Sequence, residues 1–209
     1  MVNVNTRPCS PLAAYSGTEQ MQSILTDYVR GLRQCLDEIE KQDVAGAADI
    51  IYQAYLEGKQ VFVFGNGGSA ATASHMVCDL RKGASVPGKP RLRMTCLSDN
   101  TPLMTAIGND ISYEDVFVEQ LISQVQEGDV VIAISCSGNS PNVLKAVEYA
   151  KKCGAVSIGF TACGGGLLGS LVDLSITLST RDFGQAEDIH LSLEHLLSYM
   201  VKSRIASEE

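Results

Sequence analysis

The chain has 209 residues, of which 45% are hydrophobic and 19% are charged, so it is long enough for one globular domain with a buried core. Its formal net charge of −8 argues against a nucleic-acid-binding surface, because such a surface needs a basic field. We find neither a secretory signal pattern nor an apolar stretch long enough to span a bilayer, and therefore expect a cytoplasmic protein without a membrane partner.

Residues 1–16 contain two prolines and several small polar residues, which predicts a flexible N-terminal arm. We expect residues 17–209 to form a single domain, because no linker rich in proline, glycine and serine divides them. From Thr18 to about Leu56, apolar residues recur at every third or fourth position, which predicts one long amphipathic helix, or two with a break near residues 42–44. A long helix ahead of an α/β unit often packs on another subunit, so this segment suggests an oligomer.

Short apolar runs then alternate with segments of helical pattern. The predicted strands are Gln60–Phe64, Leu92–Leu97, Val130–Ile134, Val156–Phe160 and Leu174–Leu178. The predicted helices between and after them are Ala70–Arg81, Glu114–Gln126, Asn142–Lys152 and Gln185–Ile205. Strands that are apolar throughout and separated by helices are typical of a parallel sheet covered on both faces. The pattern therefore predicts an α/β domain with a doubly wound parallel sheet.

Two turns rich in glycine and serine follow the first and third predicted strands. The first is Phe64-Gly65-Asn66-Gly67-Gly68-Ser69, and the second is Ile134-Ser135-Cys136-Ser137-Gly138-Asn139-Ser140. Each would place backbone N–H groups and small hydroxyls at a helix N-terminus, where the helix dipole also favours an anion. Ser135, Ser137 and Ser140 could all donate to one phosphate. Neither turn contains a lysine or an arginine, so the sequence predicts a phosphate site built from neutral donors.

Two other interpretations of these turns remain open. Gly65-x-Gly67-x-x-Ala70 has the form of a dinucleotide-binding fingerprint, which needs an acidic residue about twenty positions further on. The nearest candidate after the second predicted strand is Asp99, which lies 29 residues past Ala70. The turns could also be plain tight turns whose serines cap helices. A P-loop is excluded, because no Gly-Lys-Ser/Thr occurs in the chain.

The candidate reacting groups are histidines and carboxylates on two predicted helices. His75 and Asp79 are four residues apart and share a helix face, and Glu187 and His195 are eight apart on the last helix. Two such pairs could supply a general acid and a general base, or four ligands for a divalent metal. A His-x-x-x-Asp pair is also common on ordinary surfaces. We interpret the third histidine, His190, as structural, because it lies on a different face from His195.

The chain has seven cysteines, an odd number with no C-x-x-C pair, and most fall in apolar segments. This pattern indicates buried free thiols in a reducing compartment rather than a disulfide framework or a thiolate metal site.

These features together resemble the SIS (sugar isomerase) domain family, and within it the phosphoheptose isomerases. The resemblance is carried by "GNGGSAATASH", "LSDNTPLMTAIGNDISYEDVF", "GDVVIAISCSGNSPNVLKAVEYAK" and "EDIHLSLEHLL". It implies that residues 17–209 form one SIS domain with a five-stranded parallel sheet flanked by helices. It also implies a homotetramer with active sites between subunits.

The resemblance further implies the roles of individual residues. Ser69, Ser135, Ser137 and Ser140 match positions that hold the sugar phosphate, together with Gly67, Gly68 and Cys136, the last where a threonine is common. Asn66 and Asp99 match positions that line the sugar. The implied reaction converts sedoheptulose 7-phosphate to glycero-manno-heptose 7-phosphate through an enediol, with Asp79 as the base and His195 as the acid. His75, Asp79, Glu187 and His195 match a site that holds Zn²⁺ in part of the family.

The sequence departs from the family pattern at positions near the sugar. Asp79 stands where glutamate is usual, and Glu187, also expected to contact substrate, stands where glutamine is common. The "DGG" motif that is usual in the family appears here as Gly164-Gly165-Gly166, without its aspartate. The sugar could therefore be another ketose phosphate. The alternative function is a non-catalytic SIS protein that binds a phosphosugar as a regulator, or acts as a scaffold for a replication initiator.

Overall fold

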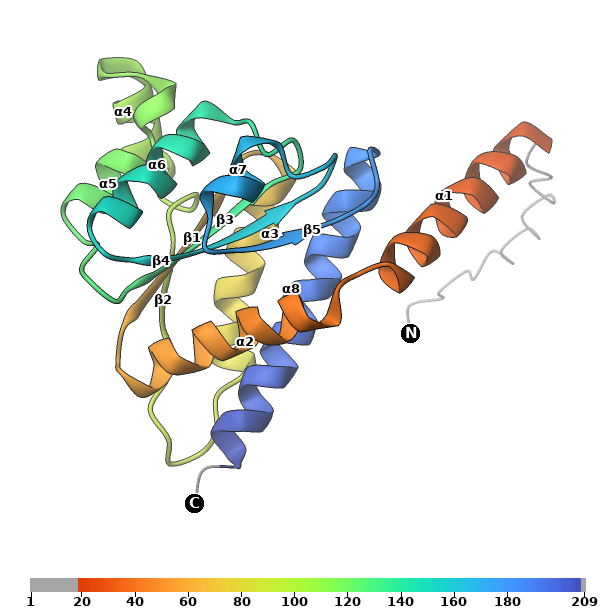
Figure 1. The fold of residues 1–209 in the computed structure, drawn as a ribbon. Coiled ribbons are helices and arrows are strands. Elements are labelled where there is room, and N and C mark those ends of the chain that lie inside the picture. The colour runs from red at the N-terminus through yellow and green to blue at the C-terminus, as the bar shows by residue number, and fades with distance from the viewer. Residues whose placement is uncertain (1–18, 208–209) are drawn as a thin grey trace, which may run out of the picture.

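The computed structural model describes residues 19–207, and the arm predicted over residues 1–16 lies outside them. Its centre is a parallel sheet with the strand order β2-β1-β3-β4-β5 (Figure 1). The strands are β1 (Gln60–Gly65), β2 (Arg93–Cys96), β3 (Val130–Ser135), β4 (Val156–Thr161) and β5 (Leu174–Thr177). The chain runs outward from β1 to β2 and then returns to β3 on the other side. The carboxyl ends of β1 and β3 therefore form the crevice in which such sheets bind ligands.

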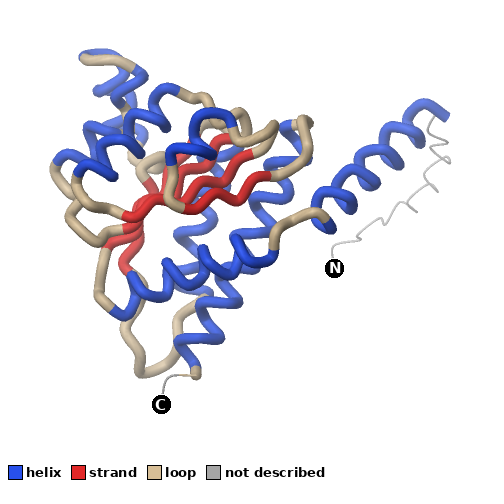
Figure 2. The backbone as a smooth tube through the Cα atoms, viewed as in Figure 1, coloured by secondary structure: helices blue, strands red, loops and turns tan. Residues whose placement is uncertain are grey.

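Helices cover both faces of the sheet (Figure 2). One face carries α2 (Lys41–Leu56), α3 (Gly68–Cys78) and α8 (Phe183–Ala206), and the other carries α4 (Thr101–Asp110), α5 (Val118–Ile122), α6 (Pro141–Lys152) and α7 (Gly166–Leu171). The side chains of β1 alternate between two cores, with Val61 and Val63 in one and Phe62 and Phe64 in the other. Both faces of the strand are buried, which explains its continuous apolar sequence.

The first helix, α1 (Glu19–Asp37), extends away from the sheet (Figure 1). Its later part contacts the beginning of α8, where the Tyr28 hydroxyl donates a 2.6 Å hydrogen bond to Asp188. Cys35 is its buried residue, whereas Met21, Ile24 and Leu25 are more than half exposed. The amphipathic pattern of α1 therefore leaves an apolar stripe uncovered in the single chain.

The predicted sheet is confirmed, and every strand lies within a residue or two of its predicted range. The helix break is at residues 38–40 rather than 42–44, because α2 already begins at Lys41. The predicted helix Glu114–Gln126 is wrong as one helix, since the segment forms a 3₁₀ turn (Tyr113–Asp115) followed by the short α5. Helices α4 and α7 were not predicted. Each buries only one residue, Ile107 or Leu168, so neither has a clear apolar period.

The described helices include none that is long and apolar enough to cross a membrane. Six cysteines fall in the described residues and all are free thiols; Cys35, Cys96 and Cys136 are buried, and Cys78 is exposed.

His190 lies in the core between α8 and β4, as its helix face predicted. Its side chain is fully buried, its Nε2 is 3.3 Å from the carbonyl oxygen of Thr161, and its ring packs against Phe160. Burial disfavours the imidazolium and lowers the pKa of His190 from 6.5 to about 4. This histidine is therefore neutral in the folded protein at neutral pH.

We expect His190 to make the protein less stable in acid. As the pH falls from 6.5 to 4, the unfolded chain binds a proton at His190 that the folded chain resists, which costs about 3 kcal/mol of unfolding free energy. His190→Gln lacks this proton uptake. The difference in unfolding free energy between wild type and variant should shrink by that amount from pH 7 to pH 4. Urea unfolding at fixed protein concentration, with a chelator present, measures it, and a constant difference would contradict the assignment.

Candidate active site

The turn between β1 and α3 presents backbone donors at the beginning of α3. Gly67 precedes α3 with a φ of +56°, a left-handed conformation that glycine adopts without strain. Ser98, after β2, anchors the turn, because its hydroxyl accepts from the Gly65 N–H at 3.3 Å and donates to the Gly65 carbonyl at 2.9 Å. Ser69, in the first turn of α3, is almost completely buried. The turn is thus a fixed loop with its donors at a positive helix end.

The turn between β3 and α6 is built in a similar way. Its hydroxyls lie close together, with Ser135 Oγ 3.3 Å from Ser140 Oγ and Ser137 Oγ accepting from the backbone N–H of Asn139 at 3.2 Å. Ser140 immediately precedes α6, whose first residue is Pro141. Proline suits this position, because the first N–H of a helix has no partner inside the helix.

The two turns and the beginning of α8 enclose one cavity of about 130 Å³. It is lined by Asn66, Ser69, Ile134, Ser135, Cys136, Ser137, Ser140, Phe183 and Glu187. Seven of the residues predicted to bind substrate therefore share one cavity, and the turn residues Gly67 and Gly68 adjoin it. Asp99 is exposed in the loop after β2 and is not part of this lining. Phe183 was not predicted.

The cavity contains a carboxylate but no lysine or arginine among its lining residues. The carboxyl group of Glu187 occupies the space that a Cβ atom on Gly68 would need, so it lies directly against the N-terminus of α3. The positive end of the helix dipole stabilises a negative charge at this place. Burial raises the pKa of the Cys136 thiol, so this residue faces the cavity as a neutral group.

Asn66 is held by two residues that the sequence did not indicate. Its side-chain amide exchanges hydrogen bonds of 2.9 and 3.0 Å with Asn142 at the beginning of α6. The Tyr113 hydroxyl also donates to Asn66 Oδ1 at 2.9 Å. These bonds fix the orientation of an amide that lines the cavity, and no sequence period signals them.

A second cluster of polar groups lies further along α3 and α8. The Nε2 atoms of His75 and His195 are 3.3 Å apart, and each is 3.6 Å from Oδ2 of Asp79. Asp79 begins a π-helical turn (Asp79–Gly83), and its carbonyl accepts from Ser198 of α8 at 3.3 Å. This turn and its contact with α8 bring side chains from two helices to one point. Three of the four residues predicted as metal ligands thus meet here.

The fourth member of the cluster is Glu194. Its Oε1 is 3.5 Å from His75 Nε2 and 3.2 Å from His195 Nε2, and its side chain is 0% exposed, against 47% and 39% for the two histidines. Burial, and secondarily the charge of Asp79, raises the pKa of Glu194 from 4.5 to about 8. The sequence contained a signal for it, since this acidic residue interrupts the buried stripe of α8 between Leu193 and Leu197.

The group of possible metal ligands in the described chain is thus His75, Asp79, Glu194 and His195, with their ligand atoms within 4.8 Å of one another. Glu187, which was predicted in this set, is not part of it. Its carboxyl group instead lies at the beginning of α3, beside Gly68.

Comparison with known proteins identifies the family of this chain. The model of the SIS domain matches residues 26–162. The chain belongs to the SIS domain family, within the phosphoheptose isomerase group. It is 37% identical over 164 residues to the phosphoheptose isomerase of Rhodospirillum rubrum, covering 78% of this chain and 87% of the relative. It is 33% identical to that of Geobacter sulfurreducens, covering 87% of this chain and 97% of the relative.

A solved structure of a phosphoheptose isomerase has the same fold as this chain. The phosphoheptose isomerase of Neisseria gonorrhoeae superposes with a TM-score of 0.80 at 26% identity. The match covers 88% of this chain and 98% of that chain. The likeness therefore extends over the whole relative rather than over one motif.

The serine turn of this SIS domain depends on a close approach between two loops. Gly138 has a φ of +63°, and its carbonyl accepts from Leu168 at 2.9 Å. A Cβ atom on Gly138 would meet the backbone carbonyl of Gly165 in the glycine run before α7. Only a residue without a side chain allows the two loops to pack this closely.

Gly138→Ala should therefore destabilise the protein more than a matched substitution elsewhere. Gly58→Ala is the control, because Gly58 has a φ of +64° and open space around it. Both variants should lose about 1 kcal/mol of unfolding free energy, because alanine is strained in the left-handed backbone conformation. Gly138→Ala should lose about 2 kcal/mol more through the clash. Urea unfolding of both variants measures this, and equal losses would show that the loop approach is unimportant.

Proposed function

We propose that this chain is a phosphosugar aldose–ketose isomerase that converts sedoheptulose 7-phosphate to glycero-manno-heptose 7-phosphate. The observation that carries the proposal is that α3 and α8 each join the serine-lined cavity to the histidine–carboxylate cluster. Ser69 and His75 are six residues apart, which is about 9 Å along α3. This length is comparable to that of a seven-carbon sugar phosphate, so the phosphate and the carbonyl end would each meet the appropriate groups.

The serine turns would bind the phosphate through hydroxyls and backbone N–H groups. The reacting end of the sugar would then lie at the histidines. Asp79 faces the histidines through Oδ2, which leaves Oδ1 to accept the proton of C1. His195 would protonate O2 as the enediol forms and then take the proton from O1. Return of a proton to C2 completes the aldose, so the reaction moves protons without a net change in oxidation state.

We also propose that His75, Asp79 and His195 hold a divalent metal such as Zn²⁺. Imidazole nitrogens and carboxylate oxygens are suitable ligands for zinc, manganese and iron. The Nε2 atoms of both histidines and Oδ2 of Asp79 already face one point. A bound divalent ion would polarise the carbonyl oxygen of the sugar. His195 Nε2 would then be a ligand, so the acid and base steps assigned to His195 belong to the site without the ion. The residues present therefore fit the metal that the family resemblance implies.

Two substitutions should separate phosphate binding from proton transfer. Ser137→Ala removes one phosphate donor and should raise KM about tenfold with little change in kcat. His195→Gln should lower kcat by at least about 100-fold, because it removes the acid. Steady-state kinetics with sedoheptulose 7-phosphate measures both, with the exposed Ser170→Ala as the control. Full turnover by His195→Gln would contradict its role, and phosphosugar binding without turnover by wild type would instead support the regulator or scaffold.

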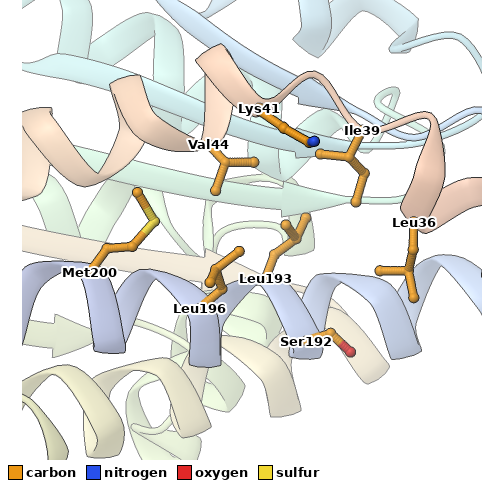
Figure 3. Close-up of a pocket in the computed structure, with 8 residues that line it drawn as sticks. All are labelled: Leu36, Ile39, Lys41, Val44, Ser192, Leu193, Leu196 and Met200. Carbon is orange, nitrogen blue, oxygen red and sulfur yellow. The ribbon is translucent and has the colours of Figure 1, made fainter.

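We further propose a homotetramer in the cytoplasm, with active sites between subunits. The apolar stripe of α1 is uncovered in the single chain. A groove of about 320 Å³ lies between the α1–α2 junction and α8, lined by Leu36, Ile39, Lys41, Val44, Ser192, Leu193, Leu196 and Met200 (Figure 3). Apolar surface of this kind at a helix interface is suited to burial against another copy. Free cysteines fit a reducing compartment.

Replacing Leu25 by glutamate should dissociate this oligomer, because Leu25 is 66% exposed on α1 and would be buried between copies. Light scattering coupled to gel filtration measures the mass of wild type and variant. The control is Gln53→Glu, which adds a charge on the exposed side of α2. A monomeric wild type, or a tetramer that tolerates Leu25→Glu, would contradict the proposed packing.

A further inference from the structure

Glu194 has the unusual property of being a fully buried carboxyl group without a hydrogen bond. In the described part of the chain, neither of its carboxyl oxygens has a hydrogen-bond partner. Buried polar groups are nearly always paired, because leaving them unpaired is costly. The ion-pair partners found for it among residues 19–207 are His75 and His195, which are charged only when protonated. A cation at this place would supply the missing positive charge.

The distances within the cluster have the pattern of a tetrahedron. The four atoms are Nε2 of His75 and His195, Oδ2 of Asp79 and Oε1 of Glu194. Five of their separations are 3.2, 3.3, 3.5, 3.6 and 3.6 Å. An ion with four tetrahedral bonds of about 2.1 Å holds its ligand atoms about 3.4 Å apart. These five separations match the edges of a tetrahedral site, and the ligand atoms of the whole group lie within 4.8 Å of one another.

The charges of the cluster also match a divalent ion. Two neutral imidazoles and two carboxylates carry a total charge of −2, which balances the ion. If Glu194 were not a metal ligand, its buried carboxylate would lie next to the ion without binding it. The electrostatics thus favour Glu194 as a ligand rather than a neighbour.

Glu187 is placed for a different task. Its carboxyl group contacts the N-terminus of α3 and lines the serine cavity. It is eight residues before His195, which is about 12 Å along α8. The positive end of α3 already stabilises the Glu187 carboxylate, so Glu187 does not require a cation beside it.

We propose that Glu194, and not Glu187, is the fourth ligand of the divalent metal held by His75, Asp79 and His195. Glu187 remains in the substrate cavity, where its carboxylate faces the sugar phosphate. This inference rests on the metal proposed above and adds the carboxylate that binds it. It concerns metal binding alone, so it can fail while the isomerase proposal stands, and an inactive enzyme would not decide it.

The test is metal binding by the intact, chelator-treated protein. Wild type, Glu194→Gln and Glu187→Gln are titrated with Zn²⁺ and with Co²⁺, whose visible spectrum reports its ligands. Glu187→Gln is the matched control, since it makes the same change on the same helix. Wild type and Glu187→Gln should bind one ion per chain with the same Co²⁺ spectrum. Glu194→Gln should bind at least about 100-fold more weakly and with an altered spectrum.

A second variant distinguishes a ligand from a structural residue. Glu194→Met keeps the length of the side chain and removes its charge. In chelator it should melt at or above the wild-type temperature, because the unpaired carboxylate is gone. Added Zn²⁺ should raise the melting temperature of wild type but not of this variant. The proposal is overturned if Glu194→Gln keeps wild-type affinity and spectrum, if Glu187→Gln loses the ion instead, or if wild type binds none.

Discussion

The parallel pairing of β1 with β3 is the constraint on which the site depends. Gly65 pairs with Ile134 at the carboxyl end of this ladder, so the two turns that follow leave the sheet side by side. Each turn leads directly into a helix, and the two helix N-termini therefore point into one cavity. Without this register the serine hydroxyls of the second turn and the backbone donors of the first would belong to separate sites. A shift by one residue would also exchange the two buried faces of β3, which the cores on either side do not permit.

The relative positions of the cavity and the cluster are set by the paths of α3 and α8. Both begin at the cavity, and both continue to the histidine–carboxylate cluster, so one pair of helices fixes the distance between the two ends of a substrate. The protein carries a net charge of −8 and places no lysine or arginine in the cavity lining. An anion bound there would rely on helix N-termini and hydroxyls beside the Glu187 carboxylate, whereas the cluster concentrates negative charge and suits a cation. The two ends of the site thus have opposite electrostatic preferences within a few helical turns.

Much of this was predictable because it depends on local pattern. The five strands are continuous apolar runs, and the two turns are marked by glycine and serine next to them, so the sheet and the cavity could be predicted. Glu194 was missed because a buried acidic residue breaks the apolar pattern that identifies a helix face, and its partners come from another helix. The contacts of Asn66 with Asn142 and Tyr113 join distant segments and have no sequence period. Glu187 was placed in the metal set by its spacing from His195 and by family resemblance. Its position beside Gly68 depends on the approach of α8 to α3, which the sequence does not encode locally.

Proton NMR of sedoheptulose 7-phosphate incubated with the purified protein in deuterated water tests the isomerase proposal most directly. We expect a new aldose signal with deuterium at C2, because the proton that Asp79 takes from C1 can exchange with solvent before a proton is returned to C2. Binding of the sugar phosphate without either product or exchange would contradict the proposal that this cavity and cluster form one isomerase site.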